Sequence, residues 1–178
     1  MPVRLPLCRR NRGSTMRAMA MRVGILTVSD AGSRGERVDT SGAAIREMIE
    51  GIGGEIVCYA IVADERDLIA STLREWCDGG EADIVLTTGG TGLAARDVTP
   101  EATLDVAERL VPGIVEAMRA AGARSTPMAM LSRAMAVVRG STLIVNLPGS
   151  EKGARESVGA VIDALPHAVQ LLRGDTQH

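Results

Sequence analysis

The sequence predicts a three-layer, doubly wound α/β domain with a mostly parallel sheet and helices on both faces. Short apolar runs rich in β-branched residues recur along the chain, and amphipathic helical patterns separate them. Strands that alternate with helices are typical of a parallel sheet, and continuous apolar runs are typical of strands buried on both faces. With 178 residues, of which 46% are hydrophobic, the chain is long enough for one domain and too short for two ordinary ones.

The first half of the chain has the pattern βαβαβ. Strands are expected at 23–28, 55–63 and 83–86, and the polar turn 29–35 follows the first of them. The first helix is expected to begin near Asp39 and to end at Gly53-Gly54, because Ile45, Met48, Ile49 and Ile52 have helical spacing. A second helix is expected at 67–77.

The second half continues this alternation. Thr99 is expected as an N-cap with Pro100 at the first helical position, and a further helical stretch follows Pro112-Gly113. After the Met-rich segment 127–138, a buried strand is expected at 142–147. The last amphipathic helix carries Ala154, Val158, Val161, Ile162 and Leu165, and Pro166 starts or kinks a final helix through Leu172.

Residues 21–174 are expected to form the folded domain. Residues 1–20 contain five arginines and no long apolar block, so neither a membrane span nor a secretory signal is predicted, although the segment could mimic a transit peptide. We expect either a disordered tail or a later translation start, because Met16, Met19 and Met21 offer alternatives.

Composition excludes several function classes. The net charge is −2 and aromatic residues make up 1%, which argues against nucleic acid bound by bulk electrostatics or by base stacking. Cys8, Cys58 and Cys77 lack metal-ligand spacing and are expected as buried thiols, which fits a reducing, cytoplasmic location. The only histidines are His167 and His178, and the sequence suggests no Ser/His/Asp or Cys/His arrangement for nucleophilic catalysis.

The segment from Ile84 to Glu101 is predicted to bind phosphate. A strand runs into Thr88-Gly89-Gly90-Thr91-Gly92, whose glycines let backbone N–H groups approach an anion and whose threonines add hydroxyl donors. The helix N-terminus at Thr99-Pro100-Glu101 adds a favourable dipole. Asp97 would repel a phosphate unless a divalent cation lay between them, so Mg²⁺ is expected.

Other polar loops also directly follow predicted strands. They contain Ser29 and Asp30, then Asp64, and finally Pro148, Gly149 and Ser150. In an open parallel sheet the carboxyl ends of the strands meet at one edge, so one crevice is expected to collect these loops with the glycine loop.

Several candidate site residues also have ordinary explanations. Asp97 could cap the helix at Thr99, Asp64 could begin the following helix, and Ser29-Asp30 could be only a turn. Asp39 is interpreted as a helix-start residue.

Two cations have alternatives as well. Arg96 could form a surface ion pair, but a phosphate-binding role is favoured. Lys152, the only lysine in the chain, could reach a ligand phosphate or be a solvated surface residue.

The motifs TVSD, SRGERVDTSG, VADE, TTGGTGLAARDVTPEAT and NLPGSEKGA together resemble the MoaB/MogA family of molybdenum cofactor biosynthesis proteins, from about Arg22 to Leu172. The resemblance implies a homotrimer or hexamer that transfers AMP from ATP to the phosphate of molybdopterin and releases pyrophosphate. It implies catalytic roles for Asp64 and Asp97, which would hold Mg²⁺. A handover of product to a molybdenum-insertion protein is also expected.

Within this resemblance, Thr88 to Gly92 would bind phosphate, and Ser29, Asp30 and Ser150 would contact pterin or nucleotide. Glu151 stands where related loops often have proline, and MoaB-type relatives leave open a non-catalytic molybdopterin-binding scaffold. Met118, Met128, Met130 and Met135 could be core residues or could form the trimer interface.

Overall fold

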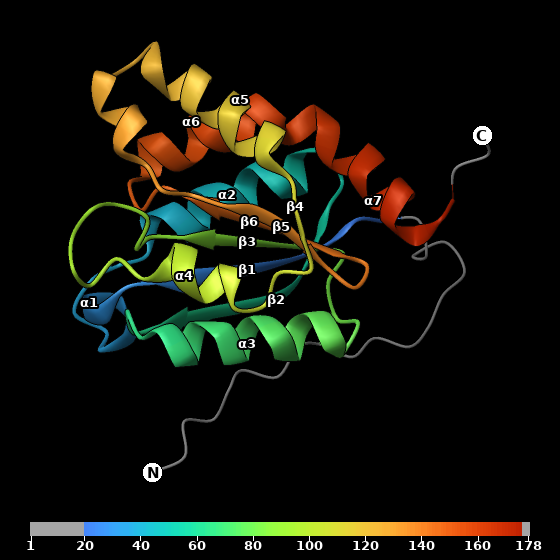
Figure 1. Cartoon of the computed structure of the whole chain (residues 1–178), viewed down its shortest axis with the longest axis horizontal. Coiled ribbons are helices and arrows are strands. Elements are labelled where there is room, and N and C mark those ends of the chain that lie inside the picture. The colour runs from blue at the N-terminus through green and yellow to red at the C-terminus, as the bar shows by residue number, and fades with distance from the viewer. Residues whose placement is uncertain (1–19, 176–178) are drawn as a thin grey trace.

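The computed structural model describes residues 20–175 as a six-stranded sheet with helices on both faces (Figure 1). The elements are β1 (Arg22–Val28), α1 (Asp30–Ser33), α2 (Thr40–Gly51), β2 (Glu55–Val62), α3 (Arg66–Asp78), β3 (Ile84–Thr88), α4 (Thr99–Leu104), β4 (Arg109–Leu110), α5 (Pro112–Ala123), the 3₁₀ helix η2 (Pro127–Leu131), β5 (Ala136–Arg139), β6 (Thr142–Leu147), α6 (Glu151–Val161), the 3₁₀ turn η3 (Ile162–Ala164) and α7 (Leu165–Arg173).

The strand order is β2-β1-β3-β6-β5-β4. The first four strands in this order run parallel, whereas β5 is antiparallel to β6 and β4 is antiparallel to β5. The predicted mostly parallel, doubly wound α/β fold is therefore confirmed. It also brings the carboxyl ends of β1, β2, β3 and β6 to one edge of the sheet.

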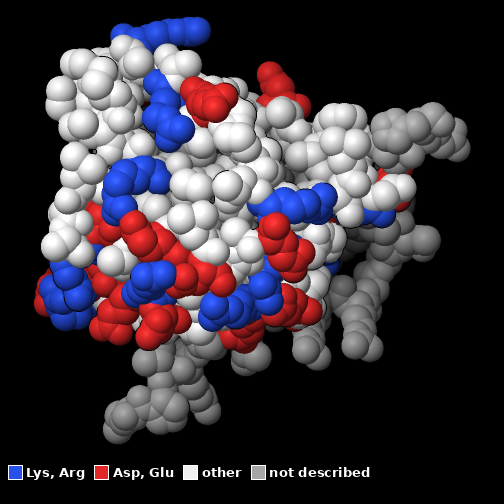
Figure 2. Space-filling view, in the orientation of Figure 1, with Lys and Arg blue, Asp and Glu red and all other residues white. Residues whose placement is uncertain are grey.

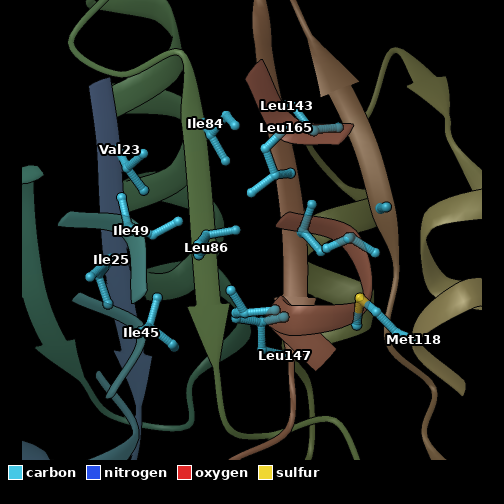
Figure 3. Packing of buried hydrophobic residues seen from close by; sticks show 14 of the residues in the cluster. Val23, Ile25, Ile45, Ile49, Ile84, Leu86, Met118, Leu143, Leu147 and Leu165 are labelled. Carbon is cyan, nitrogen blue, oxygen red and sulfur yellow. The ribbon is translucent and has the colours of Figure 1, made fainter. Parts of the chain in front are cut away.

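Two apolar layers hold the helices onto the sheet. On one face, α2, α5, α6 and α7 bury residues such as Ile45 and Leu165 against the sheet residues Val23, Ile84 and Leu147 (Figure 3). On the other face, α3 and α4 pack with the second cluster, which is made of Leu26, Val28, Cys58, Ala60, Val62, Ile69, Ala70, Leu73, Trp76, Cys77, Ala82, Val85, Ala102, Val106, Val137 and Ile144. Burial of apolar area at roughly 25 cal/mol per Å² is the main force that fixes both layers.

Two local expectations need correction, and the structure defines a third segment for which no element was predicted. The predicted turn at 29–35 contains the single helical turn α1, whose N-cap is Ser29. The N-cap of α4 is Val98, and Thr99 is the first helical residue, because its hydroxyl donates to the Gly89 carbonyl at 2.9 Å instead of capping. The Met-rich segment 127–138 divides into η2 and the start of β5, where the buried residues Val137 and Val138 pair with β6.

Cys77 is a buried free thiol whose pKa burial raises to about 12, and Cys58 is also buried. The expectation of buried thiols therefore holds for Cys77, and Cys58 has the expected burial; Cys8 lies outside the described residues. Within residues 20–175, no helix is long and apolar enough to span a membrane. The expectations for residues 1–19 fall outside the described part of the chain.

Candidate functional site

A hollow of about 370 Å³ lies at the carboxyl edge of the parallel strands. The end of β1, the residue Asp64 after β2, the end of β3 and the loop after β6 all contribute to it. It is lined by Thr27, Val28, Ser29, Gly32, Arg37, Val38, Asp39, Thr40, Ser41, Asp64, Thr88, Gly89, Gly90, Gly149 and Ser150. The predicted convergence of four polar loops on one crevice is thus seen in the structure.

The glycine loop has the geometry of an anion cradle. Gly89 and Gly90 have φ of 99° and 63°, values that side chains rarely allow. A Cβ on Gly89 would collide with the Val28 carbonyl oxygen, so the loop lies directly against the end of β1. Within the described residues, the amides of Gly90, Thr91 and Gly92 donate to no acceptor, and unbonded amides of this kind are donors that an anion can use.

Asp64 and Asp30 tie two neighbouring loops together. The Asp30 amide donates to Asp64 Oδ2 at 2.7 Å, and the Asp64 amide donates to Asp30 Oδ1 at 3.1 Å. Burial raises the pKa of Asp64 above its ordinary value, and the amide hydrogen bond from Asp30 opposes this shift only in part. Asp64 does not begin the following helix, because the N-cap of α3 is Glu65.

Asp97 lies in the loop that leads from the glycines to α4. Its amide donates to the Ala94 carbonyl at 2.9 Å, and its Oδ2 accepts the Ala94 amide at 2.8 Å, so the carboxylate closes a tight turn. The helix-cap interpretation of Asp97 is wrong, since α4 has no side-chain cap.

Both carboxylates lie against the same glycine loop. A Cβ on Gly90 would lie 3.2 Å from Asp64 Oδ1, and a Cβ on Gly92 would lie 2.8 Å from Asp97 Oδ2. The negative charge of Asp97 also contributes to the raised pKa of Asp64. The two aspartates therefore share one end of the sheet, although Asp97 does not line the hollow itself.

Arg96 and Asp30 form an ion pair beside the site. The guanidinium Nη2 lies 2.8 Å from both carboxylate oxygens of Asp30, and the hydrogen bonds from Arg96 hold the pKa of Asp30 below its usual value. The Arg96 side chain is 62% exposed. The pair therefore links the Asp97 loop to α1 at the surface.

A buried polar network supports the glycine loop from below. Thr88 Oγ1 donates to the Pro148 carbonyl at 2.7 Å, which ties the loop after β3 to the loop after β6. Asn146 Nδ2 donates to Thr87 Oγ1 at 2.9 Å and to Thr103 Oγ1 at 2.8 Å, and all three residues are fully buried. These bonds fix the loop relative to β6 and α4.

A second hollow of about 280 Å³ adjoins the first. The glycine loop and the loop after β6 lie between the two hollows. Thr91, Gly92, Pro148 and Ser150 line the second hollow, while Gly90 and Gly149 line the first. Most of the remaining lining comes from α5, η2 and α6.

The predicted site residues thus fall into three groups. The first hollow is lined by Ser29, Asp64, Thr88, Gly89, Gly90, Gly149 and Ser150, and the second by Thr91, Gly92, Pro148 and Ser150. Asp30, Arg96, Asp97, Thr99, Glu101 and Lys152 line neither hollow. Lys152 is 78% exposed and lies 3.9 Å from Glu156 Oε1, whereas Glu101 is paired with Arg133.

The segment 37–41 belongs to the site although the sequence did not predict it there. Asp39 is the N-cap of α2 through the Gly42 amide, as expected, but it also accepts hydrogen bonds from Thr27 and Tyr59 and lines the first hollow. Its hydrogen bonds, against the opposing effect of burial, keep the pKa of Asp39 low. The SRGERVDTSG motif was the signal available, since its polar residues follow a strand.

No group of three or more His, Cys, Asp or Glu side chains with metal-binding geometry exists in residues 20–175. Asp64 Oδ1 and Asp97 Oδ1 accept no hydrogen bond from any described residue. The site therefore offers one unoccupied carboxylate oxygen from each of two aspartates.

Comparison with known proteins gives a consistent result. The family model described as "Probable molybdopterin binding domain" matches residues 24–167. A molybdopterin adenylyltransferase of Helicobacter pylori (strain J99) is 45% identical over 155 residues, which span 86% of this chain and 88% of that one. The Escherichia coli (strain K12) protein of the same name is 38% identical over 169 residues, 86% of each chain.

A solved structure is similar over the same range. The molybdopterin biosynthesis enzyme MoaB of Thermus thermophilus is 58% identical and superposes with a TM-score of 0.82, covering 86% of this chain and 97% of that one. The chain therefore belongs to the MoaB/MogA family of molybdenum cofactor biosynthesis proteins.

Proposed function

We propose that this protein is a molybdopterin adenylyltransferase that acts in molybdenum cofactor biosynthesis. The observation that carries the proposal is the convergence of Asp64, Asp97 and the glycine loop at the carboxyl ends of four parallel strands. The relatives that bear this name match the chain over most of its length. The substrates would be ATP and molybdopterin.

The reaction needs alignment more than acid or base catalysis. An oxygen of the molybdopterin phosphate attacks the α-phosphorus of ATP, a new P–O bond forms, the bond to the β-phosphate oxygen breaks, and pyrophosphate leaves. Because the nucleophile is already anionic, no general base is required, and the protein must orient two anions and offset their charge. The free amides of Gly90, Thr91 and Gly92 are suited to that task.

Mg²⁺ fits the two aspartates. Magnesium is bound by one or two carboxylates together with substrate phosphates, and Asp64 Oδ1 and Asp97 Oδ1 are the oxygens left free for it. The ion would offset negative charge on the phosphates. In this proposal, Asp30 and Arg96 hold the two aspartate loops together, and Arg96 can turn from Asp30 to a ligand phosphate.

The remaining candidates have supporting roles in the proposal. Ser29, Thr88, Gly89, Gly149 and Ser150 line the hollow and would contact pterin or nucleotide. Thr99 would act through the glycine loop that it binds, and Glu101 through its pairing with Arg133. Lys152 would meet only a ligand that reaches the first turn of α6.

Pyrophosphate release with ATP, molybdopterin and Mg²⁺ tests the function. Asp64→Asn and Asp97→Asn should each lower the rate by about 10³-fold, which corresponds to several kcal/mol of transition-state stabilisation. Asp105→Asn is the matched control, because Asp105 pairs with Arg66 at the surface. Molybdopterin binding without pyrophosphate release by the wild-type protein would instead support a non-catalytic scaffold.

Assembly as a homotrimer or hexamer is part of the proposal. Met128 and Met130 are 61% and 70% exposed, and Leu131 is 45% exposed, so η2 offers apolar side chains to another subunit. Figure 2 shows charged residues gathered over the half of this face where α1, α3 and α4 lie, and fewer of them over the other half. Met118 is buried and belongs to the core. A monomer by light scattering would contradict the assembly.

We also keep a cytoplasmic location and a handover of product to a molybdenum-insertion protein as expectations of the proposal. Fractionation of cells and a pull-down with the insertion protein would test them.

A further inference from the structure

Arg133 makes a set of contacts that the sequence did not predict. It lies between η2 and β5, and its partners lie 32 to 42 residues earlier in the chain. Its backbone amide donates to the Thr91 carbonyl at 2.9 Å, and its Nε donates to the Gly92 carbonyl at 2.7 Å. Its two terminal nitrogens donate to the Asp97 carbonyl and to the Glu101 carboxylate.

These contacts enclose the segment that carries Asp97. The carbonyls of Gly92 and Asp97 mark the two ends of the excursion 92–97, and one planar guanidinium binds both of them. The residues between these ends are exposed, and Leu93, for example, is 65% exposed. They therefore bury little apolar area that could hold the loop in place. The guanidinium therefore sets the separation and direction of the two ends.

Glu101 holds the guanidinium in place from the first turn of α4. One of its carboxylate oxygens pairs with Arg133, and the other is buried without a hydrogen-bond partner among the described residues. Arginine can bridge two carbonyls and a carboxylate because its N–H donors form a rigid fork, whereas lysine carries a point charge on a flexible stem. Arg133 thus joins the loop and the helix that begins two residues after Asp97.

We propose that Arg133 is a positioning residue for the adenylyl transfer, which holds the Asp97 loop against the glycine loop. This inference rests on the proposed function. Arg133 acts through Asp97 and does not touch the substrates. A displacement of about 1 Å at a catalytic group can cost on the order of 10²-fold in rate.

The test compares Arg133→Met with Arg139→Met. Arg139 also has several partners, since it donates to both Asp78 oxygens and to the Val106 carbonyl, but it lies at the other end of β5. In pyrophosphate release, Arg133→Met should lower kcat by about 10- to 100-fold and leave KM for molybdopterin within about threefold. Arg139→Met should leave both values unchanged.

A double-mutant cycle separates positioning from a general structural effect. If Arg133 acts through Asp97, Arg133→Met should lower the rate of the Asp97→Asn variant by less than about threefold. An equal loss in both backgrounds, or a loss matched by Arg139→Met, would overturn the inference.

Hydrogen exchange tests whether Arg133 holds the Asp97 loop, without a measurement of activity. The amides of Ala94 and Asp97, which are bonded within the loop, should exchange about tenfold faster in Arg133→Met and at the wild-type rate in Arg139→Met. If the wild-type protein releases no pyrophosphate, the proposed function fails, but this measurement still shows whether Arg133 holds the Asp97 loop. Unchanged exchange at both amides in Arg133→Met would refute the positioning role of Arg133.

Discussion

Gly90→Ala is expected to cost far more stability than the same change at Gly140, although both glycines have positive φ. Their φ values are 63° and 55°, and a left-handed conformation costs a non-glycine residue roughly 1–2 kcal/mol. A Cβ on Gly140 meets no atom within 4 Å, so this conformational cost is the whole effect expected there. Gly140→Ala therefore serves as the control for backbone strain.

At Gly90 a second cost arises from contact. The Cβ would overlap the Thr99 hydroxyl, which is fully buried and donates to the Gly89 carbonyl at 2.9 Å. Displacing that hydroxyl leaves a carbonyl without its donor, at a cost of roughly 1–3 kcal/mol. The total for Gly90→Ala is then about 2–5 kcal/mol.

Urea unfolding of both variants measures the difference directly. Gly90→Ala should be less stable than Gly140→Ala by about 1–3 kcal/mol, and it should also release pyrophosphate more slowly, because the Cβ lies 3.2 Å from Asp64 Oδ1. Equal free energies of unfolding for the two variants would show that contact with Thr99 contributes nothing and would refute the reasoning.

Three further predictions concern buried and surface polar groups. Burial alone would raise the pKa of Asp83, but hydrogen bonds from Arg22 and Arg173 lower it. The Asp83 carboxylate therefore stabilises the fold fully above the unfolded pKa of about 3.9, and this stabilisation is lost as pH falls through the lower pKa of the folded state. Asp83→Asn should therefore reduce the free energy of unfolding at pH 7 and flatten its decline below pH ~4 in acid titrations; an unchanged slope would contradict this. Asn146→Leu should cost about 2–3 kcal/mol in urea unfolding, because it removes the two buried hydrogen bonds to Thr87 and Thr103 and the bond accepted from the Met135 amide. A cost near zero would show that the network is dispensable. Arg96→Met should leave the denaturation midpoint unchanged because its ion pair is exposed, but should raise KM for ATP several-fold in steady-state kinetics, and an unchanged KM would remove Arg96 from the phosphate proposal.

Much of the fold could be predicted because strand and helix periodicity is local. The expected helix near Asp39 begins at Thr40 with Asp39 as its N-cap, and the expected strand at 142–147 matches β6. The antiparallel strands β4 and β5 were not predicted, since β4 has two residues and both depend on pairing with β6 through β5. A strand of that length carries no periodic signal.

The amino-acid sequence by itself determined which loops follow buried strands, and therefore that Ser29, Asp64, Thr88 and Ser150 gather at one edge of the sheet. Only the tertiary structure decided that Asp97 and Glu101 lie outside the hollow, that Asp39 lines it, and that Arg133 binds the loop. The physical reason is the distance along the chain over which sequence patterns carry information. Hydrophobic patterns record neighbours within a few residues, whereas a side-chain contact across more than 30 residues depends on the packed positions of two elements and leaves no pattern in either.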